Sequence, residues 1–467
     1  MSIRFGTDGW RAIIGEDFIP ENIAQVIQAF ADRYPKLPEA GKPVFIGYDR
    51  RNKSKESADL IASVLLGNHI PVWLSQDFCP TPCVSWHVKT NGAAAGIMVT
   101  ASHNPPKWNG IKFKESYGGA ASADFLQPIE KIIEENQNKK LVPKTKELNG
   151  NSLSYFNPHQ EYLEALRKLV DLDLIKKANF KILFDPLYGA GSGFLEDLLG
   201  NQVTTLHGEA DFNFGGLHPE PIQPYVNQAM EKMRSGNFST CMITDGDADR
   251  IGAVDEKGNY VTSHQIFALL LKHLVENKLM KGKVLKSIST TVMIDRLCQK
   301  QGLPMNVTPI GFKYLSPAMK EPGVLIGGEE SGGIGMPHHI PERDGLFCAL
   351  LLLELMATKK KLLGELVADL QKEVGPCFYK RIDLTLPKDK IETVKRTLSS
   401  FTPSMLAGQK LKKITLIDGY HFSLEDDSWL LIRPSGTEPL LRTYAEAPTF
   451  SQVEKLLREA QNLVAKA

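Results

Sequence analysis

Short apolar runs alternate with amphipathic stretches along the first 373 residues. Runs at 44–48, 71–74 and 96–100 predict buried strands, with helices before and between them. One of these helices has Pro20 in its first turn, and Ser54 is a candidate cap for the next. The pattern restarts with strands at 181–184 and 240–243. It restarts again with a helix from Ser263, and alternation of this kind is typical of α/β layers.

Two changes in the pattern predict domain boundaries. Residues 136–157 are polar and aperiodic, so we expect a first α/β domain at 1–145, followed by α/β domains at 146–257 and 258–373. After residue 373, strands are expected at 379–385, 413–417, 429–432 and 441–445, around one helix near 388–398. This last quarter, 374–467, therefore predicts an α+β domain.

Composition narrows the function classes. The chain has 467 residues, and its 55 Lys and Arg against 54 Asp and Glu give a net charge of +1. The chain therefore has no overall positive charge that would attract nucleic acid or an anionic membrane. The longest apolar stretch, 346–356, is far short of the roughly 20 residues that cross a bilayer, and predicts a buried helix. The N-terminal segment lacks the apolar core of a signal peptide.

Cysteine usage indicates a reducing compartment. The six cysteines stand at positions 79, 83, 241, 298, 348 and 377. This scatter argues against both a disulfide framework and a four-ligand zinc site. We therefore expect a cytoplasmic protein.

The most specific local motif is Thr244-Asp-Gly-Asp-Ala-Asp-Arg250, directly after a predicted strand. Asp245, Asp247 and Asp249 alternate with small residues and can turn toward one hard cation. The loop resembles the start of an EF-hand, but Arg250 stands where that loop needs Gly. A solvated acidic turn is the alternative. We favour a metal site, because three unpaired acids repel one another, and three protein oxygens with room for a phosphate suit Mg²⁺.

Ser102 lies in Thr100-Ala-Ser-His-Asn-Pro105, at the end of a predicted strand. A serine there is expected to be presented at the crevice where α/β sheets bind ligands, as a candidate nucleophile. The motif is not the Gly-x-Ser-x-Gly of hydrolases. On this loop alone, a turn serine that bonds its own backbone is the more common situation.

Two further loops offer ligand groups. In Gly327-Gly-Glu-Glu-Ser-Gly-Gly333, Glu329 and Ser331 suit sugar hydroxyls, although a flexible acidic turn fits equally well. In Arg433-Pro-Ser-Gly-Thr-Glu-Pro439, an Arg fork, two hydroxyls and backbone N–H groups form a candidate phosphate nest, and a structural turn is the alternative. His338 and His339 have no spaced metal partner, so polar ligand contacts are favoured there.

Taken in this order, and together with Phe5-Gly-Thr-Asp-Gly-Trp-Arg11, these motifs resemble the α-D-phosphohexomutase superfamily. The resemblance spans essentially the whole chain. It implies three α/β domains with mixed sheets in three layers, plus a C-terminal α+β domain, around a central cleft. It also raises Ser102 from a turn residue to the carrier of a transferable phosphoryl group.

The resemblance implies roles for the remaining motif residues. Ser102, Asp245, Asp247 and Asp249 would hold one Mg²⁺ per chain. Lys112 would be the general acid or base, although its pKa near 10.4 would have to be lowered unless it acts only as an acid. His103 would support the loop. Substrate phosphate and sugar would be bound by Arg11, Arg250, Lys313, Glu329, Ser331, His339, Arg343, Arg433, Ser435, Gly436 and Thr437.

The implied reaction interconverts glucose 1-phosphate and glucose 6-phosphate through glucose 1,6-bisphosphate. Bacterial family members that act on both mannose and glucose phosphates, and those that act on glucosamine phosphate, commonly have His after the Ser-Gly of the sugar loop, where this chain has Gly333. A dual mannose and glucose enzyme is the alternative, followed by a phosphoglucosamine mutase or a serine-dependent phosphatase. The expected partner is a phosphosugar, with no nucleic acid or membrane, and the chain would be a monomer or homodimer.

Overall fold

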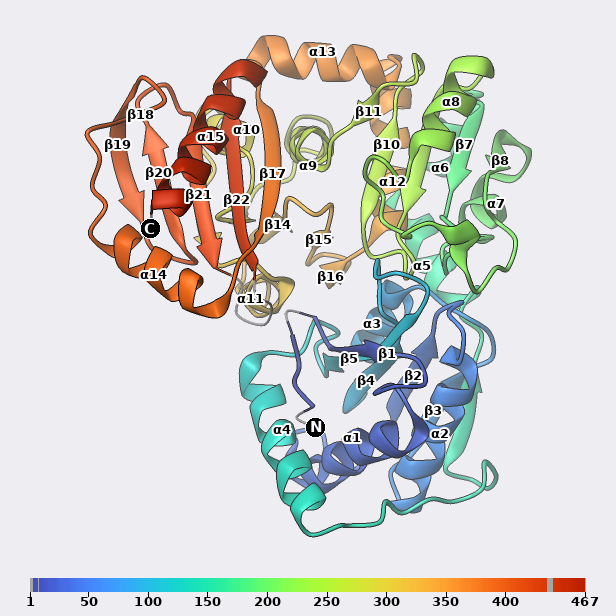
Figure 1. The fold of residues 1–467 in the computed structure, drawn as a ribbon. Coiled ribbons are helices and arrows are strands. Elements are labelled where there is room, and N and C mark those ends of the chain that lie inside the picture. The colour runs from blue at the N-terminus through green and yellow to red at the C-terminus, as the bar shows by residue number, and fades with distance from the viewer. Residues whose placement is uncertain (1–2, 7, 435–439, 467) are drawn as a thin grey trace.

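The computed structural model describes residues 3–6, 8–434 and 440–466 (Figure 1). They form four units, each built on its own sheet, so the predicted three α/β domains and one α+β domain are confirmed. Within these residues, no helix has the length and apolar character that crossing a bilayer requires.

The first domain has a six-stranded mixed sheet in the order β1-β5-β4-β2-β3-β6. Strand β2 pairs in parallel with β3 and β4, whereas β5 runs antiparallel to β1 and β4. Its elements are β1 (Trp10–Ile13), α1 (Pro20–Arg33), β2 (Val44–Tyr48), α2 (Ser54–Gly67), β3 (Val72–Ser75), α3 (Thr81–Thr90), β4 (Ala95–Val99), β5 (Trp108–Glu115), α4 (Ala123–Asn138) and β6 (Leu153–Phe156).

Strand β6 corrects the expected end of this domain. A boundary at 145 assigns Leu153–Phe156 to the second domain, but β6 pairs in parallel with β3 as the outermost strand of the first sheet. The polar stretch before β6 is thus a return connection across the first domain, which explains why it carries no apolar periodicity.

The second domain has a five-stranded sheet in the order β11-β10-β9-β7-β8. Strands β7, β8 and β9 are parallel, and β10 turns back antiparallel along β9. Its elements are α5 (Glu161–Leu169), α6 (Leu172–Lys177), β7 (Ile182–Asp185), α7 (Phe194–Leu199), β8 (Val203–Thr205), α8 (Asn227–Ser235), β9 (Thr240–Thr244), β10 (Ile251–Val254) and β11 (Tyr260–Val261).

The third domain repeats this plan, with its strands in the order β13-β12-β14-β15-β16. Strand β12 pairs in parallel with β13 and β14. Its elements are α9 (Ser263–Lys272), β12 (Lys283–Ser287), α10 (Val292–Gln301), β13 (Met305–Thr308), α11 (Phe312–Ala318), β14 (Val324–Gly328), β15 (Ile334–Met336), β16 (Ile340–Arg343), α12 (Gly345–Lys359) and α13 (Leu363–Val374).

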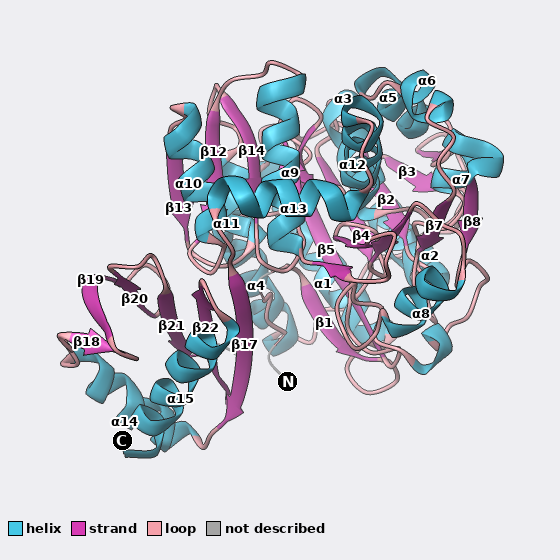
Figure 2. Cartoon of the chain, turned by 90° about the horizontal axis from the view of Figure 1, so that it is seen from above, coloured by secondary structure: helices cyan, strands magenta, loops and turns pink. Residues whose placement is uncertain are grey.

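The fourth domain is an antiparallel sheet in the order β17-β22-β21-β20-β19-β18. Figure 2 shows this sheet and its two helices set beside the other three domains. Its elements are β17 (Phe378–Thr385), α14 (Lys388–Ser399), β18 (Met405–Leu406), β19 (Gln409–Thr415), β20 (Tyr420–Leu424), β21 (Trp429–Pro434), β22 (Leu440–Ala447) and α15 (Phe450–Lys466).

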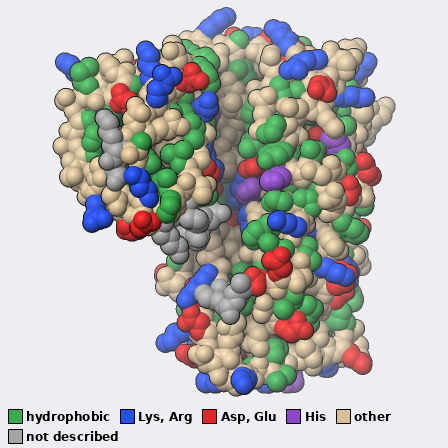
Figure 3. All heavy atoms as spheres, in the orientation of Figure 1, with side chains coloured by type: hydrophobic (Ala, Val, Ile, Leu, Met, Phe, Trp, Pro, Cys, Tyr) green, Lys and Arg blue, Asp and Glu red, His purple; other side chains and the backbone are tan. Residues whose placement is uncertain are grey.

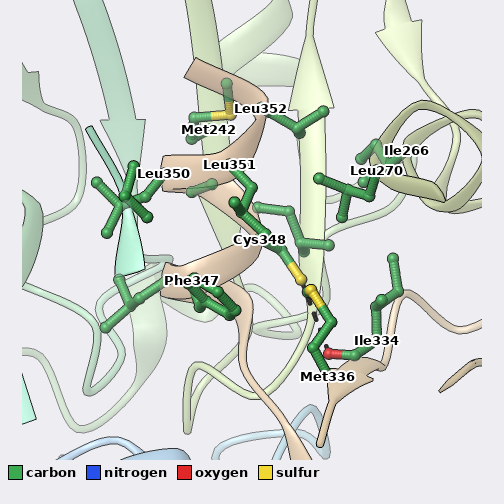
Figure 4. Packing of buried hydrophobic residues seen from close by; sticks show 14 of the residues in the cluster. Met242, Ile266, Leu270, Ile334, Met336, Phe347, Cys348, Leu350, Leu351 and Leu352 are labelled. Carbon is green, nitrogen blue, oxygen red and sulfur yellow. Dashed lines mark hydrogen bonds between the residues drawn. The ribbon is translucent and has the colours of Figure 1, made fainter. Parts of the chain in front are cut away.

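Helix α12 joins the second and third domains. It is apolar on every side, as expected for a buried helix, and Leu350, Leu351 and Leu352 are fully buried. Figure 4 shows these three leucines in one hydrophobic cluster with Met242 of β9 and Leu270 of α9. One hydrophobic core therefore includes residues of the first three domains, while the first and the fourth domains each also have a core of their own.

Candidate active site

The candidate residues lie where strands end. Ser102 follows β4, the three aspartates follow β9, Glu329 follows β14, and Arg343 ends β16. The topology therefore directs loops of the first three domains toward one region, and Arg433 on β21 adds the fourth.

Ser102 is held in a strained backbone conformation by its neighbours. Its φ is +54°, and its N–H donates to Thr100 Oγ1 at 2.8 Å. Its hydroxyl donates to Asp245 Oδ2 at 2.8 Å. Ser102 is fully buried, which corrects the expectation that it would be presented at an open crevice, because the acidic loop of the second domain covers it.

The three aspartates form one buried cluster. Their ligand atoms lie within 4.8 Å of one another. Oδ1 of Asp247 and Oδ1 of Asp249 are buried without a hydrogen-bond partner, which leaves two carboxylate oxygens free for a cation. Burial and the charges of Asp247 and Asp249 raise the pKa of Asp245 well above its usual value. This donor set fits a hard divalent cation such as Mg²⁺.

Lys112, on β5, is bound directly to this cluster. Its Nζ lies 2.7 Å from Asp247 Oδ2, 2.8 Å from Asp249 Oδ2 and 2.7 Å from Asp8 Oδ2. Burial alone would lower the pKa of Lys112, but these carboxylates hold it above its usual value. Lys112 is thus an ion-pair partner of the acidic loop.

Arg343 connects the same cluster to the third domain. Its Nη2 lies 2.5 Å from Asp8 Oδ2 and 2.8 Å from Asp249 Oδ2, while its Nε contacts Glu342 Oε1 at 3.1 Å. Glu342 in turn pairs with Lys114 of the first domain at 2.5 Å. Asp8, Asp249 and Arg343 thus join three domains through charges that are buried or nearly buried.

His103, Arg11 and Arg250 surround the Ser102 loop. His103 Nδ1 lies 3.4 Å from Ser102 Oγ, and Arg11 donates to Asn104 Oδ1 at 2.7 Å. Arg250 pairs with Glu220 at 3.2 Å. Burial and the positive charges of Arg250 and Arg11 lower the pKa of His103 well below its usual value, so its ring is neutral.

In the motif at 327–333, called the sugar loop here, Glu329 is buried and accepts a hydrogen bond from the N–H of Gly311 at 2.7 Å. Burial and the charge of Glu330 raise the pKa of Glu329 to about 7. Ser331 is half-buried on the same loop, and Lys313 is half-buried at the start of α11. This loop combines a titratable carboxyl with an accessible hydroxyl.

His339 lies in a different setting. It is buried, and its Nε2 lies 2.9 Å from Asp344 Oδ2, which also accepts a hydrogen bond from the hydroxyl of Tyr162. The ring packs against Phe347 of α12. These contacts favour a structural role for His339 over the ligand contact that we expected.

Arg433, at the end of β21, is held by Asp418, whose Oδ2 lies 2.9 Å from Arg433 Nε. Burial lowers the pKa of Arg433, but Asp418 raises it, and the net pKa lies above the usual value. Ser435, Gly436 and Thr437 lie outside the described residues. Figure 3 shows a hollow between the fourth domain and the rest of the molecule, with Lys and Arg side chains inside it.

Comparisons with known proteins agree with this arrangement. Four family models match in chain order: phosphoglucomutase/phosphomannomutase α/β/α domain I at residues 2–140, domain II at 160–258, domain III at 262–374, and the C-terminal domain at 388–463. The chain belongs to the phosphoglucomutase/phosphomannomutase family. Members of this family are isomerases that interconvert sugar phosphates.

Curated and solved members of the family match over the whole chain. A protein of Pyrococcus abyssi that carries a phosphoglucosamine mutase name is 32% identical over 100% of this chain and 99% of its own. A phosphoglucomutase/phosphomannomutase of Thermococcus kodakarensis is 29% identical over 100% of this chain and 99% of its own. A solved structure from Thermus thermophilus, titled as a phosphomannomutase, has 31% identity and a TM-score of 0.87, covering 100% of this chain and 99% of that one.

Arg51 is a site residue of this family member that sequence reasoning missed. Its side chain is fully buried, and it donates to the carbonyl oxygens of Ser102 at 2.6 Å and Asn104 at 2.7 Å. It also donates to Pro105 and Trp108, both at 3.1 Å. One guanidinium therefore binds four carbonyls of the Ser102 loop. The available signal was its place just after β2, at the same sheet edge as Ser102.

Proposed function

We propose that this chain interconverts glucose 1-phosphate and glucose 6-phosphate, with Ser102 as the phosphoryl carrier and glucose 1,6-bisphosphate as the intermediate. The observation that carries the proposal is the hydrogen bond of 2.8 Å from Ser102 Oγ to Asp245, inside a buried cluster of three aspartates. A serine hydroxyl beside a carboxylate cluster that fits a cation is suited to phosphoryl transfer. A serine with a purely structural role would need one hydrogen-bond acceptor and not three acids.

The reaction consists of two phosphoryl transfers between Ser102 and the sugar. In the first, a sugar hydroxyl oxygen attacks phosphorus on phosphorylated Ser102, the bond from phosphorus to Oγ breaks, and a bisphosphosugar forms. In the second, the other phosphate of the reoriented bisphosphosugar returns to Ser102. Lys112, kept protonated by the carboxylate partners that raise its pKa, gives a proton to the leaving oxygen and takes up the proton of the attacking hydroxyl, so each transfer balances.

Asp245, Asp247 and Asp249 would hold Mg²⁺ together with an oxygen of phosphorylated Ser102. When bound, the cation neutralises charge that develops on the transferring phosphoryl group. Arg433, with Ser435, Gly436 and Thr437, would grip the substrate's other phosphate. Arg11, Arg250, Lys313 and Arg343 supply further positive charge along the path, and His103 supports the Ser102 loop.

The preference for glucose rests on Gly333. A Cβ there would lie 2.4 Å from Cδ of Arg343, so the stem of Arg343 fills the space that a side chain at this position needs. The imidazole common in dual mannose and glucose enzymes and in glucosamine enzymes therefore has no room beside Arg343, and Glu329 and Ser331 remain to bind the sugar hydroxyls. Amino-sugar phosphate is the second candidate, favoured by the phosphoglucosamine mutase name of the Pyrococcus abyssi relative.

Two measurements test the proposal. Intact mass spectrometry should find one added phosphate, localised to Ser102, and Ser102→Ala should abolish turnover while ligand binding persists. Turnover by Ser102→Ala would rule the mechanism out. Values of kcat/KM for glucose 1-, mannose 1- and glucosamine 1-phosphate should be highest for glucose, and a clear preference for either other sugar would overturn that assignment.

A serine-dependent phosphatase would share the phosphoserine but release phosphate. Addition of trace glucose 1,6-bisphosphate distinguishes the two activities, because it primes Ser102 of a mutase. We expect stimulated isomerisation without steady phosphate release. Steady release without isomerisation would favour the phosphatase.

A further inference from the structure

Asp418 bridges two domains at the edge of the candidate site. It lies in the turn between β19 and β20 of the fourth domain. Its Oδ2 lies 2.9 Å from Nε of Arg433, and the same oxygen accepts a hydrogen bond of 3.0 Å from the N–H of Ile310 in the third domain. One carboxylate oxygen therefore holds both the candidate phosphate-binding arginine and a backbone group of the neighbouring domain.

The contact continues into the sugar loop. The residue after Ile310 is Gly311, whose N–H donates to Glu329 Oε1 at 2.7 Å. Two consecutive N–H groups of the third domain thus point to two acids: the first binds Asp418, and the second binds Glu329. The path from Arg433 to Glu329 passes through one carboxylate and two adjacent peptide groups.

The turn is shaped for this close approach. Gly419, next to Asp418, has a φ of +98°, a conformation that favours glycine. A Cβ at this position would lie 2.7 Å from the carbonyl oxygen of Ile432 and 3.0 Å from Cα of Arg433. A side chain there would push the turn away from Arg433, so the glycine allows Asp418 to reach both partners.

Two other contacts across the same interface lie outside the site motifs. Glu446 of β22 accepts hydrogen bonds of 3.0 Å from Thr291 Oγ1 and from the N–H of Val292, at the start of α10. Asp427 pairs with Arg296 of α10 at 3.3 Å. These contacts attach the fourth domain to the third, whereas the contact of Asp418 joins two ligand-binding loops.

We propose that Asp418 is a positioning residue that couples the grip of Arg433 on phosphate to the orientation of Glu329 for the sugar; this coupling rests on the proposed function. Phosphate bound at Arg433 fixes Asp418, Asp418 fixes the peptide at 310–311, and that peptide holds the carboxyl of Glu329. The sugar loop is thereby set for a ligand whose phosphate is already bound in the fourth domain.

Kinetics give the first test. Asp418→Ala removes the acceptor for Ile310 and the partner of Arg433, so KM for the phosphosugar should rise about 10- to 100-fold, with a smaller change in kcat. In the double variant Asp418→Ala/Glu329→Gln, the fold loss of kcat/KM should be at least about tenfold smaller than the product of the losses in the two single variants. Effects that multiply would overturn the coupling while leaving the mutase proposal intact.

Hydrogen exchange gives a test that needs no turnover. Inorganic phosphate should slow amide exchange in peptides covering 308–313 in the wild-type chain and in Asp427→Ala, the matched control from the same interface. It should not do so in Asp418→Ala. Absence of protection in the wild type, or equal protection in Asp418→Ala, would overturn the coupling whatever the fate of the mutase activity.

Asp418→Asn is a second variant that tests the coupling even if Asp418→Ala misfolds. It keeps the size of the side chain and an oxygen acceptor but removes the charge opposite Arg433. Its thermal unfolding should match the wild type, and its protection by phosphate should be intermediate. A normally folded Asp418→Asn with unchanged KM and unchanged protection would also count against the coupling.

Discussion

Lys112 Nζ lies 2.7 Å from Oδ2 of Asp247, and both side chains are buried. The ammonium therefore neutralises part of the carboxylate cluster that fits a divalent cation. Removing one partner of a buried ion pair leaves an uncompensated charge, which costs more than the pair itself contributes. Lys112 and a bound cation thus share the task of balancing the same acids.

Replacement of Lys112 by Met should reveal this sharing. We expect the free energy of unfolding in EDTA to fall by about 3–5 kcal/mol, because the carboxylates lose their internal cation. Added Mg²⁺ should recover more stability in Lys112→Met than it adds to the wild type, since it then supplies most of the neutralising charge. Urea unfolding with EDTA and with Mg²⁺ measures both effects.

Lys114→Met is the matched control for this experiment. Lys114 forms an equally buried pair with Glu342 rather than with one of the three aspartates. Its loss should destabilise the chain by a similar amount but should not enlarge the stabilisation by Mg²⁺. Equal stabilisation by Mg²⁺ in the wild type and in Lys112→Met would contradict the shared role.

Asp247→Asn should weaken Mg²⁺ binding at least about tenfold, because it removes one of the few charged ligands. Titration calorimetry measures the affinity, and loss of turnover should accompany it. Glu256→Gln is the control. Glu256 occupies the twelfth position of an EF-hand alignment, yet it accepts a hydrogen bond from the N–H of Gly364, so its removal should leave Mg²⁺ affinity unchanged. A larger effect of Glu256→Gln would revive the EF-hand alternative.

Local patterns predicted the elements well and the side-chain partnerships poorly. The strand at 44–48 and the helix from Ser263 begin where apolar periodicity places them. Ser54 was expected as a cap, but it is the first residue of α2, and its hydroxyl donates to Asp49. Periodicity reports which face is buried; it carries no information about which polar group a side chain binds.

The candidate site shows the same division. Ser102 and the three aspartates are visible in sequence because each motif is compact and follows a strand. Arg51 and Asp418 are not visible, because each binds backbone groups that are distant in sequence, 51 to 57 residues away for Arg51 and 108 for Asp418. A lone Arg or Asp in a polar turn is usually solvated surface, so only the folded arrangement distinguishes these two.

Glu329 should make stability depend on pH. Its pKa of about 7 in the folded chain exceeds the ordinary value of 4.5, so between these values the folded state keeps a proton that the unfolded state releases. Its contribution to stability therefore falls as pH rises from about 4.5 to 7, by about 3 kcal/mol in total. Glu329→Gln lacks this ionisation.

Urea unfolding at pH 5 and pH 8 checks the sign. The stability of Glu329→Gln relative to the wild type should be higher at pH 8 than at pH 5. Glu321→Gln, which changes an exposed acid on the same domain, should show no such difference. A relative stability of Glu329→Gln that is flat with pH would mean that Glu329 ionises normally.

Arg51→Met tests whether the Ser102 loop must be held in place for the reaction. Methionine keeps much of the apolar volume but leaves the four carbonyl oxygens of the loop without their donor, so Ser102 should lose its fixed position beside Asp245. A displacement of about 1 Å is enough to cost about 100-fold in rate, and we expect a loss of this size in kcat with little change in KM. Arg51→Lys retains the charge but cannot bind four carbonyls at once, so it should rescue stability more than kcat. Stopped-flow transfer from phosphorylated Ser102 separates the two effects, and a normal transfer rate in a folded Arg51→Met would show that the loop keeps its geometry without the clamp.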